Sequence, residues 1–440
     1  MTSIVAFTFV LGVLIFVHEL GHFVMARRIG VRVLTFSLGF GPKLLSFRRG
    51  DTEYCVSAIP LGGYVKMAGE SPDDARTGAS DEFLSKTKWQ RFQVLVMGPV
   101  MNLALAVIVM ALVLYQGAQL PAFESQPVVV GGLVEQSVAA AAGVQVGDRI
   151  VSVEGEDVPH WRALTFAIAT RTQRPTSLGI NRDGKYIDLT VVPSSMDKYG
   201  TGGIGVLPWA HPQISEVRPN QPAAEAGLMA GDVVLAAGGE KNVLYDRLLV
   251  LIRGSEGKPL QFEVRRGTEL HSVTVVPRML EGGPKIGATI RRIETRTLKP
   301  GLIEAFKLSV EQNWEWSALI VKTLGGLFTR ETSVKQLMGP VAIAGLSGEA
   351  AQQDSWIPLF TLMAMISLNL GLLNLMPIPV LDGGHITILA LESISRRDFS
   401  MKVKEKMLLA GFVLLLMLMV TVIYNDLMRI QWIERLVPWR

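Results

Sequence analysis

The sequence contains a single cysteine and few charged residues. Charged side chains make up 19% of its 440 residues, and the only cysteine is Cys55. One cysteine excludes an intrachain disulfide framework. The net charge of +4 is small and scattered, so nucleic acid is not an expected partner. With 49% hydrophobic residues, the composition is instead typical of an integral membrane protein in a lipid bilayer.

The N-terminal segment also lacks the marks of a cleavable leader. It has neither a basic n-region nor a small-residue cleavage pattern, so we expect it to be retained as a membrane span. Gly98, Pro99 and Asn102 interrupt a second span, where they shape helix packing or lie near a functional site. The hydropathy pattern predicts four spans, at about Thr2 to Met25, Val94 to Tyr115, Trp356 to Met376 and Met407 to Tyr424.

The first span contains the pattern His18-Glu19-Leu20-Gly21-His22. Residues four apart lie on one face of a helix, so both imidazoles are expected to point to one place, as ligands of a Zn²⁺ ion. The carboxylate of Glu19 is placed to take a proton from water. The alternative is that these are polar residues packed at a helix end. Each charged group at membrane depth costs roughly 2.5 to 3.5 kcal/mol, so a chance occurrence of the motif there is disfavoured.

Asp382 is the candidate third ligand, because a hydrolytic zinc site needs three protein ligands and an open position. The third span ends in the segment from Asn374 to His385, where two prolines and two glycines are expected to break the helix. Asp382 would then face inward from non-helical backbone. A helix N-cap and a hydrogen-bond partner of a ligating histidine are its other candidate uses.

Short β-prone runs between Val31 and Met67 alternate with turn residues. The turns fall at Gly39 to Pro42, Arg49 to Asp51 and Leu61 to Gly63, which predicts small hairpins. Placed beside the metal, the edge of such a sheet would offer hydrogen bonds to an extended peptide. An ordinary loop with hairpins is the alternative.

The region from about Pro121 to Arg291 contains an internal duplication. Ala142-Gly143-Val144 followed by Gly147-Asp148 recurs at a constant offset as Ala226-Gly227-Leu228 followed by Gly231-Asp232. The pattern resembles that of PDZ domains in the permuted bacterial arrangement, and PDZ domains bind peptide ends along a sheet edge. The candidate carboxylate loops are residues 131–134 and 203–206. Peptide capture and a purely steric role are both open.

Charge patterning predicts the membrane topology. Clusters of Arg and Lys follow the first and third spans, which places these loops in the cytoplasm. The duplicated region and both termini then lie outside, and the metal site lies near the cytoplasmic end of the first span. Leu298 to Thr329 is expected to form an amphipathic helix at the membrane surface, and Trp432 and Trp439 predict a C-terminal interfacial helix.

Together these motifs resemble the site-2 protease family of intramembrane zinc metalloproteases. The resemblance lies in H-E-x-x-H within a first span, the N-x-x-P-x-P-x-L-D-G pattern that begins at Asn374, and the tandem PDZ-like repeats. It implies zinc held by His18, His22 and Asp382, with Glu19 as general base. It also implies that Asn374 contacts the substrate backbone or the oxyanion of the reaction. The hairpins would hold an unwound substrate strand, at Gly39, Gly41, Gly62 and Gly63.

The resemblance further implies a bacterial inner-membrane protein that acts in envelope-stress signalling. Its substrates would be single-span membrane proteins, notably an anti-sigma factor already trimmed outside the membrane, and remnant signal peptides. The PDZ-like pair would exclude substrates that carry bulky outer domains.

The expected fold class is a polytopic α-helical membrane protein with four transmembrane helices, a small membrane-associated β-hairpin region and two inserted PDZ-like α/β domains. The expected divisions are a membrane part (1–120), a first PDZ-like domain (121–203), a second PDZ-like domain (204–291), an amphipathic helical connector (292–355) and a second membrane part (356–440). Two other functions compete with proteolysis. One is a non-catalytic membrane adaptor that holds exported peptides on its PDZ pair, and the other is a metal or ion transporter.

Overall fold

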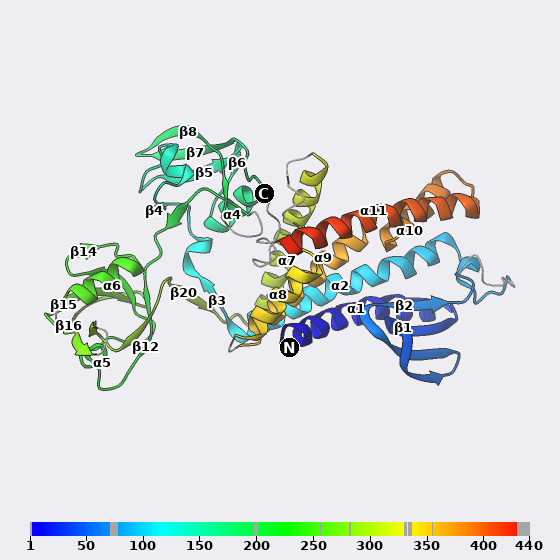
Figure 1. Ribbon diagram of the computed structural model, residues 1–440, viewed down its shortest axis with the longest axis horizontal. Helices are drawn as coiled ribbons and strands as arrows, with labels where there is room; N and C mark the ends of the chain where they lie inside the picture. Colours follow the sequence, from blue (N-terminus) through cyan, green and yellow to red (C-terminus); the bar gives the residue numbers. More distant parts are fainter. Residues whose placement is uncertain are drawn as a thin grey trace. The chain divides into compact units, whose positions relative to one another are not determined.

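The chain forms two compact units (Figure 1). The computed structural model describes residues 2–70, 78–196, 201–255, 257–280, 283–329, 332, 337–353 and 355–428. The first unit consists of Met1–Ala118, Lys299–Phe328 and Val334–Arg440, and the second consists of Gln119–Leu298 with Thr329–Ser333.

The first unit is mainly helical. Among the described residues, four helices are long and apolar enough to cross a membrane, and they correspond to the four predicted spans. These are α1 (Thr2–Ile29), α2 (Lys88–Gly117), α9 (Ile357–Asn374) and α11 (Met401–Met428). The other helical elements are η1 (Phe83–Ser85), α7 (Leu302–Phe328), α8 (Pro340–Ala351) and α10 (Asp382–Ile394).

Helix α2 is the central helix of this unit. It packs against α1, α7, α9 and α10, and Figure 1 shows α1 and α2 running side by side. Aliphatic side chains such as Leu14, Val113 and Ala364 fill the core between α1, α2 and α9. The hydroxyl of Ser309 in α7 donates a hydrogen bond to the Val107 carbonyl of α2 at 2.6 Å. One face of α2 can therefore position residues that come from several other helices.

The interruption expected in the second span is not a break in the helix. Helix α2 continues from Lys88 to Gly117 with Pro99 inside it. Proline removes one backbone donor, but membrane helices tolerate this loss where neighbouring helices surround them. The expected interruption was therefore wrong for the backbone, and Gly98 and Asn102 remain as breaks only in the apolar side-chain pattern.

The region before the third span contains two helices. Helix α7 corresponds to the expected amphipathic helix. Helix α8 was not predicted, because its small and apolar residues show no amphipathic period. Asp426 of α11 caps its first turn by accepting hydrogen bonds from the backbone N–H groups of Gly339 at 3.1 Å and Ala342 at 3.0 Å. The C-terminal helix expected around Trp432 lies outside the described residues.

Two long bent strands form an antiparallel sheet that contacts α1: β1 (Val33–Arg49) and β2 (Thr52–Met67). Phe36 pairs with both Tyr54 and Val65, so each strand doubles back to give a sheet of four segments instead of separate small hairpins. The reversals coincide with the predicted turns. Residues 63–67 pair on one side only among the described residues, which leaves this segment as a sheet edge.

The second unit is an α/β region with two hydrophobic cores, one around Ile150, Leu178 and Ile180 and one around Val234, Phe262 and Val264. Its main sheets run β6-β5-β7-β8 and β16-β15-β13-β12-β19, with β14 paired to β13. The helical elements are η2 (Ala122–Ser125), α3 (Val138–Ala141), α4 (Trp161–Ala169), α5 (Pro222–Glu225) and α6 (Tyr245–Gly254).

The strands up to residue 208 are β3 (Ala118–Pro121), β4 (Val130–Leu133), β5 (Arg149–Val153), β6 (Glu156–Asp157), β7 (Thr176–Arg182), β8 (Lys185–Val191), β9 (Ser194–Ser195), β10 (Gly202–Gly203) and β11 (Val206–Pro208). The later strands are β12 (Gln213–Val217), β13 (Val233–Ala237), β14 (Glu240–Lys241), β15 (Leu260–Arg266), β16 (Glu269–Val275), β17 (Arg278–Leu280), β18 (Gly283–Lys285), β19 (Ala288–Arg291) and β20 (Thr295–Leu298).

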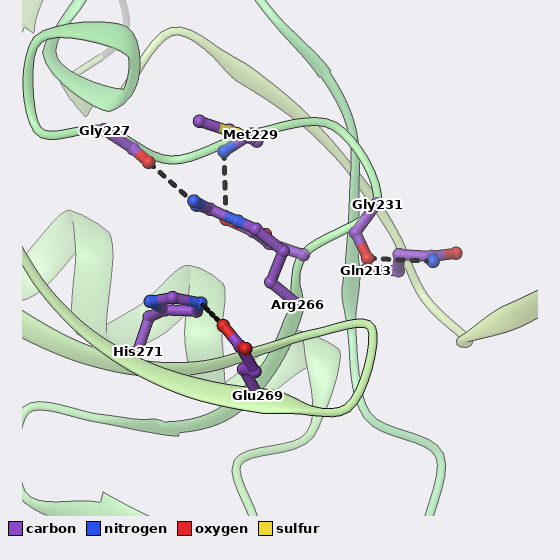
Figure 2. Close-up of polar contacts among 8 residues, drawn as sticks. Gln213, Gly227, Met229, Gly231, Arg266, Glu269 and His271 are labelled. Atoms are coloured by element: carbon purple, nitrogen blue, oxygen red, sulfur yellow. Dashed lines mark hydrogen bonds and ion pairs between the residues drawn. The ribbon is translucent and has the colours of Figure 1, made fainter.

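Each copy of the duplicated motif contains the same arginine–aspartate pair. Asp148 is 2% exposed and accepts two hydrogen bonds of 2.7 Å from Arg182, which also donates to the Gly143 carbonyl. Arg266 makes the matching contacts in the second copy. It donates two hydrogen bonds to Asp232, and Figure 2 shows its contact with the Gly227 carbonyl. The partners are 34 positions apart in both copies. The two arginines were not predicted, although their equal spacing from the Gly-Asp motif was a visible signal.

The Asp148–Arg182 pair is expected to make stability depend on acid pH. The Arg182 guanidinium lowers the pKa of the Asp148 carboxyl. A lowered folded-state pKa gives stability that is complete above the unfolded Asp pKa of about 3.9 and is lost as the pH falls through the folded value. Arg182→Met should lower the unfolding temperature at pH 7 and weaken its decline in acid. Thermal unfolding of the full chain measures both effects.

Arg149→Met is the matched control, because Arg149 is an exposed arginine of β5 in the same copy. It should leave both the unfolding temperature and its acid dependence as in the wild type. Equal unfolding profiles for Arg182→Met and Arg149→Met at every pH would show that the pair does not stabilise this region.

Candidate metal centre

Two histidines of α1 meet a carboxylate of α10. His18 Nε2 lies 3.1 Å from Asp382 Oδ2 and 3.2 Å from His22 Nε2. His22 Nε2 lies 3.5 Å from the same carboxylate oxygen. The three ligand atoms lie within 4.8 Å of one another, and both histidines are 8% exposed. The structure thus brings together side chains from opposite ends of the chain into a buried group that can hold a metal ion.

The separations between these atoms fit a zinc ion. Bonds of about 2.0 to 2.2 Å from zinc to nitrogen and oxygen place tetrahedral ligand atoms about 3.3 Å apart. The three observed separations lie close to this value. Two imidazoles and one carboxylate also form a typical ligand set for a catalytic zinc with one open position.

Helix α2 forms the wall against which both imidazoles pack. His22 Nδ1 donates a hydrogen bond to the Val94 carbonyl at 2.8 Å, which leaves its Nε2 unprotonated and free to bind a metal. The Asn102 side-chain amide lies 3.2 Å from His18 Nδ1. Between them, a Cβ on Gly98 would come within 2.2 Å of His22 Nε2, so only glycine fits. The sequence marked Gly98 and Asn102 as unusual for a span and left both a packing role and a place near a functional site open, but it did not indicate that they contact the two histidines.

Glu19 faces the sheet edge formed by residues 63–67. A Cβ on Gly63 would lie 3.0 Å from Glu19 Cγ, so the strand β2 passes close to this side chain. Glu19 is half-buried and does not belong to the group of three ligand atoms. Glu19 is therefore a neighbour of the candidate metal ligands and not one of them.

The other predicted substrate-binding glycines serve the bends of the sheet. Gly39, Gly41 and Gly62 have φ angles of +90°, +84° and +158°. A Cβ on Gly39 would lie 2.8 Å from the Ile59 carbonyl oxygen, which only glycine avoids. Contact of these glycines with a substrate stays a prediction, and Gly63 is the member of the set that lies beside Glu19.

Asn374 is the last residue of α9 and points toward the same centre. Its Nδ2 lies 3.5 Å from His18 Nε2. This distance is longer than an ordinary N–H hydrogen bond, so Asn374 does not hold the imidazole ring. Contact of the Asn374 amide with a substrate stays a prediction.

Asp382 is the first residue of α10, which corrects the expectation that it lies on non-helical backbone. The break between α9 and α10 is confined to residues 375–381, where Pro377 and Pro379 prevent helix formation. Gly383 and Gly384 lie inside α10. A Cβ on Gly384 would come within 2.2 Å of the Ile378 carbonyl oxygen, so these glycines let the first turn pack tightly on the loop before it.

A cavity of about 260 Å³ adjoins Asp382, one of the three candidate ligands. Asp382 and His385 of α10 line it together with Arg91 of α2. The cavity gives water or a peptide segment room beside the Asp382 carboxylate.

The site combines two histidines one helical turn apart, a glutamate next to one of them and a carboxylate from the far end of the sequence. This combination on helices that can cross a membrane defines an intramembrane zinc metallopeptidase. The chain belongs to peptidase family M50, whose sequence profile matches residues 6–418. This match confirms the resemblance to site-2 proteases.

Sequence similarity to known relatives extends over nearly the whole chain. The regulator of sigma-E protease RseP of Salmonella typhimurium is 34% identical over 97% of this chain and 99% of its own length. The Escherichia coli protein of the same name is 34% identical with the same coverage. A putative zinc metalloprotease of Neisseria meningitidis is 31% identical over 98% of this chain and 100% of its own length.

The chain is therefore a membrane-embedded zinc metalloendopeptidase, and the predicted activity and cofactor are confirmed at this level. The adaptor hypothesis is not favoured, because it explains neither the converging ligand atoms nor the family membership.

Proposed function

We propose that His18, His22 and Asp382 hold the catalytic zinc and that Glu19 is the general base. The convergence of the three ligand atoms next to Glu19, on helices able to cross a membrane, carries this proposal. Zinc bound there supplies Lewis acidity toward a peptide carbonyl and toward water. Glu19 accepts a proton from the attacking water at its carboxylate and delivers it to the nitrogen of the leaving amine.

The substrate peptide binds as an added strand along the edge formed by residues 63–67. A transmembrane helix hides its amides in internal hydrogen bonds, so cleavage requires local unwinding. An extended strand on this edge recovers backbone hydrogen bonds and runs past Glu19, which lies beside Gly63. Asn374 donates from its Nδ2 to the oxygen of the scissile carbonyl, where negative charge develops during attack. Gly39, Gly41 and Gly62 keep the bends that hold the edge in place.

The proposed substrates are single-span membrane proteins, including a pre-trimmed anti-sigma factor and remnant signal peptides. The relatives named as regulators of sigma-E protease support the first of these, and a role in envelope-stress signalling follows from it. The protein would lie in a bacterial inner membrane, with the metal near the cytoplasmic side and with the second unit and both termini in the periplasm. The basic clusters after α1 and before α11 support this orientation.

The two halves of the second unit are proposed to be PDZ-like domains that restrict access of bulky substrates. The repeated Asp–Arg contacts support the duplication. Ile204 belongs to the first hydrophobic core, and β11 pairs with β4, so we propose that the first domain extends to Pro208 and not to residue 203. The second then begins near Gln213. Peptide capture by either domain remains the alternative to steric exclusion.

The test is cleavage of a single-span protein by the full chain in detergent. The products should map to a bond inside the span, and a zinc chelator should stop the reaction until zinc is restored. A matched substrate whose span is replaced by polyleucine should be cut more slowly, because it unwinds less readily. Cleavage confined to residues outside the span, or insensitive to chelator, would contradict the proposal.

A further inference from the structure

The side chain of Asn102 is a fully buried polar group beside His18, one of the proposed zinc ligands. It is 0% exposed and lies on α2, with its Nδ2 assigned 3.2 Å from His18 Nδ1. Its Oδ1 is buried and has no hydrogen-bond partner among the described residues. A buried amide oxygen without a donor costs about 1 to 3 kcal/mol, so this arrangement requires an explanation.

The assigned orientation of the amide also conflicts with metal binding. If Asn102 donates to His18 Nδ1, the neutral imidazole carries its proton on Nε2. Yet His18 Nε2 is the atom that faces Asp382 Oδ2 and His22 Nε2, and a protonated nitrogen cannot ligate zinc. Exchanging the nitrogen and oxygen of an asparagine amide hardly changes the shape of the group, so the two atoms are assigned from the hydrogen bonds they make.

We infer that the side-chain amide of Asn102 is rotated by 180° about the Cβ–Cγ bond, so that Oδ1 accepts a hydrogen bond from His18 Nδ1–H. The turned amide gives the buried oxygen a donor and leaves His18 Nε2 unprotonated toward the metal. This inference rests on the proposed function of His18 as a ligand. It makes Asn102 a positioning residue that acts on zinc through His18.

The placement of Asn102 on α2 fits this role. Val94, Gly98 and Asn102 are spaced four residues apart and share one face of α2, just as His18 and His22 share one face of α1. The Val94 carbonyl already accepts from His22 Nδ1. Asn102 would complete a pair of acceptors, one for each imidazole. Its backbone is anchored in turn by Ser367 of α9, whose hydroxyl donates to the Asn102 carbonyl at 2.8 Å.

The test measures zinc affinity of the purified full chain by competition with a chromophoric chelator. Asn102→Leu removes the acceptor at similar volume and should weaken zinc binding roughly 10- to 100-fold. Asn102→Asp can accept but cannot donate, so it should bind zinc at least as tightly as the wild type. Asn313→Leu is the matched control, because Asn313 is a buried asparagine of α7 outside the metal group, and its zinc affinity should be unchanged.

The variants separate this inference from the proposed site itself. His22→Ala should lose zinc in every case. If it does while Asn102→Leu binds zinc like the wild type, the role of Asn102 is wrong and the ligand assignment stands. If His22→Ala retains zinc, the site itself is wrong. Should Asn102→Leu fail to fold, Asn102→Asp decides, since weakened zinc binding by this variant would mean that the amide donates and would overturn the inference.

Discussion

Glu19→Gln is expected to reduce cleavage of a transmembrane substrate by roughly 10²- to 10⁴-fold, the usual contribution of a general base. Glutamine keeps the shape of the side chain beside Gly63 but cannot accept a proton from water. Since Glu19 is not one of the three converging ligand residues, the zinc content of the variant should equal that of the wild type. Single-turnover cleavage, together with metal analysis of the same preparation, measures both quantities.

Glu311→Gln provides the control for the loss of one carboxylate from this chain. Glu311 is exposed on α7 and is not part of the metal group, so cleavage should proceed at the wild-type rate. Undiminished cleavage by Glu19→Gln would remove Glu19 from the mechanism. A loss of zinc from that variant would instead make it a ligand.

His22→Ala and Asp382→Asn are each expected to abolish stable zinc binding. The two side chains come from α1 and α10, and each supplies one of three ligand atoms. A three-ligand site that loses one donor keeps too few bonds to retain a hydrolytic zinc against a chelator. The wild type should bind about one zinc ion per chain at this site, and both variants should bind almost none after dialysis.

Two controls test whether these losses belong to the ligand atoms. His385→Ala removes a histidine from the same helix as Asp382, and Asp398→Asn removes an exposed carboxylate that pairs with Lys88. Neither residue is in the group of converging ligand atoms, so both variants should keep zinc. Retention of zinc by Asp382→Asn would contradict the proposal that Asp382 binds the same ion as His18 and His22.

The sequence predicted the local parts of the site better than its surroundings. The spacing of His18 and His22 is enough to place two rings on one helix face, and the apolar context made chance improbable. Asp382 was assigned to the same site because a hydrolytic zinc needs a third protein ligand. The structure places its carboxylate next to both imidazoles. The position of Asp382 within α10 was mistaken, because the prolines and glycines were assigned one common role in breaking the helix.

Contacts between helices were beyond reach of the sequence pattern. Gly98 and Asn102 look like defects in an apolar helix until α2 is packed against α1. Which face of α2 meets which face of α1 depends on the packing of all neighbouring helices, and no residue period encodes it. Helix α8 was not predicted for a related reason, since its residues are small and apolar on every side.

The proposed third ligand, Asp382, comes late in the chain, on α10. A ribosome has made nearly the entire polypeptide before Asp382 emerges, so a nascent chain already inserted in the membrane carries two imidazoles and no closing carboxylate. With the proposed ligand set, such an unfinished chain lacks one of the three ligands that a hydrolytic zinc needs. A chain truncated before α10 is therefore expected to lack cleavage activity toward neighbouring membrane proteins.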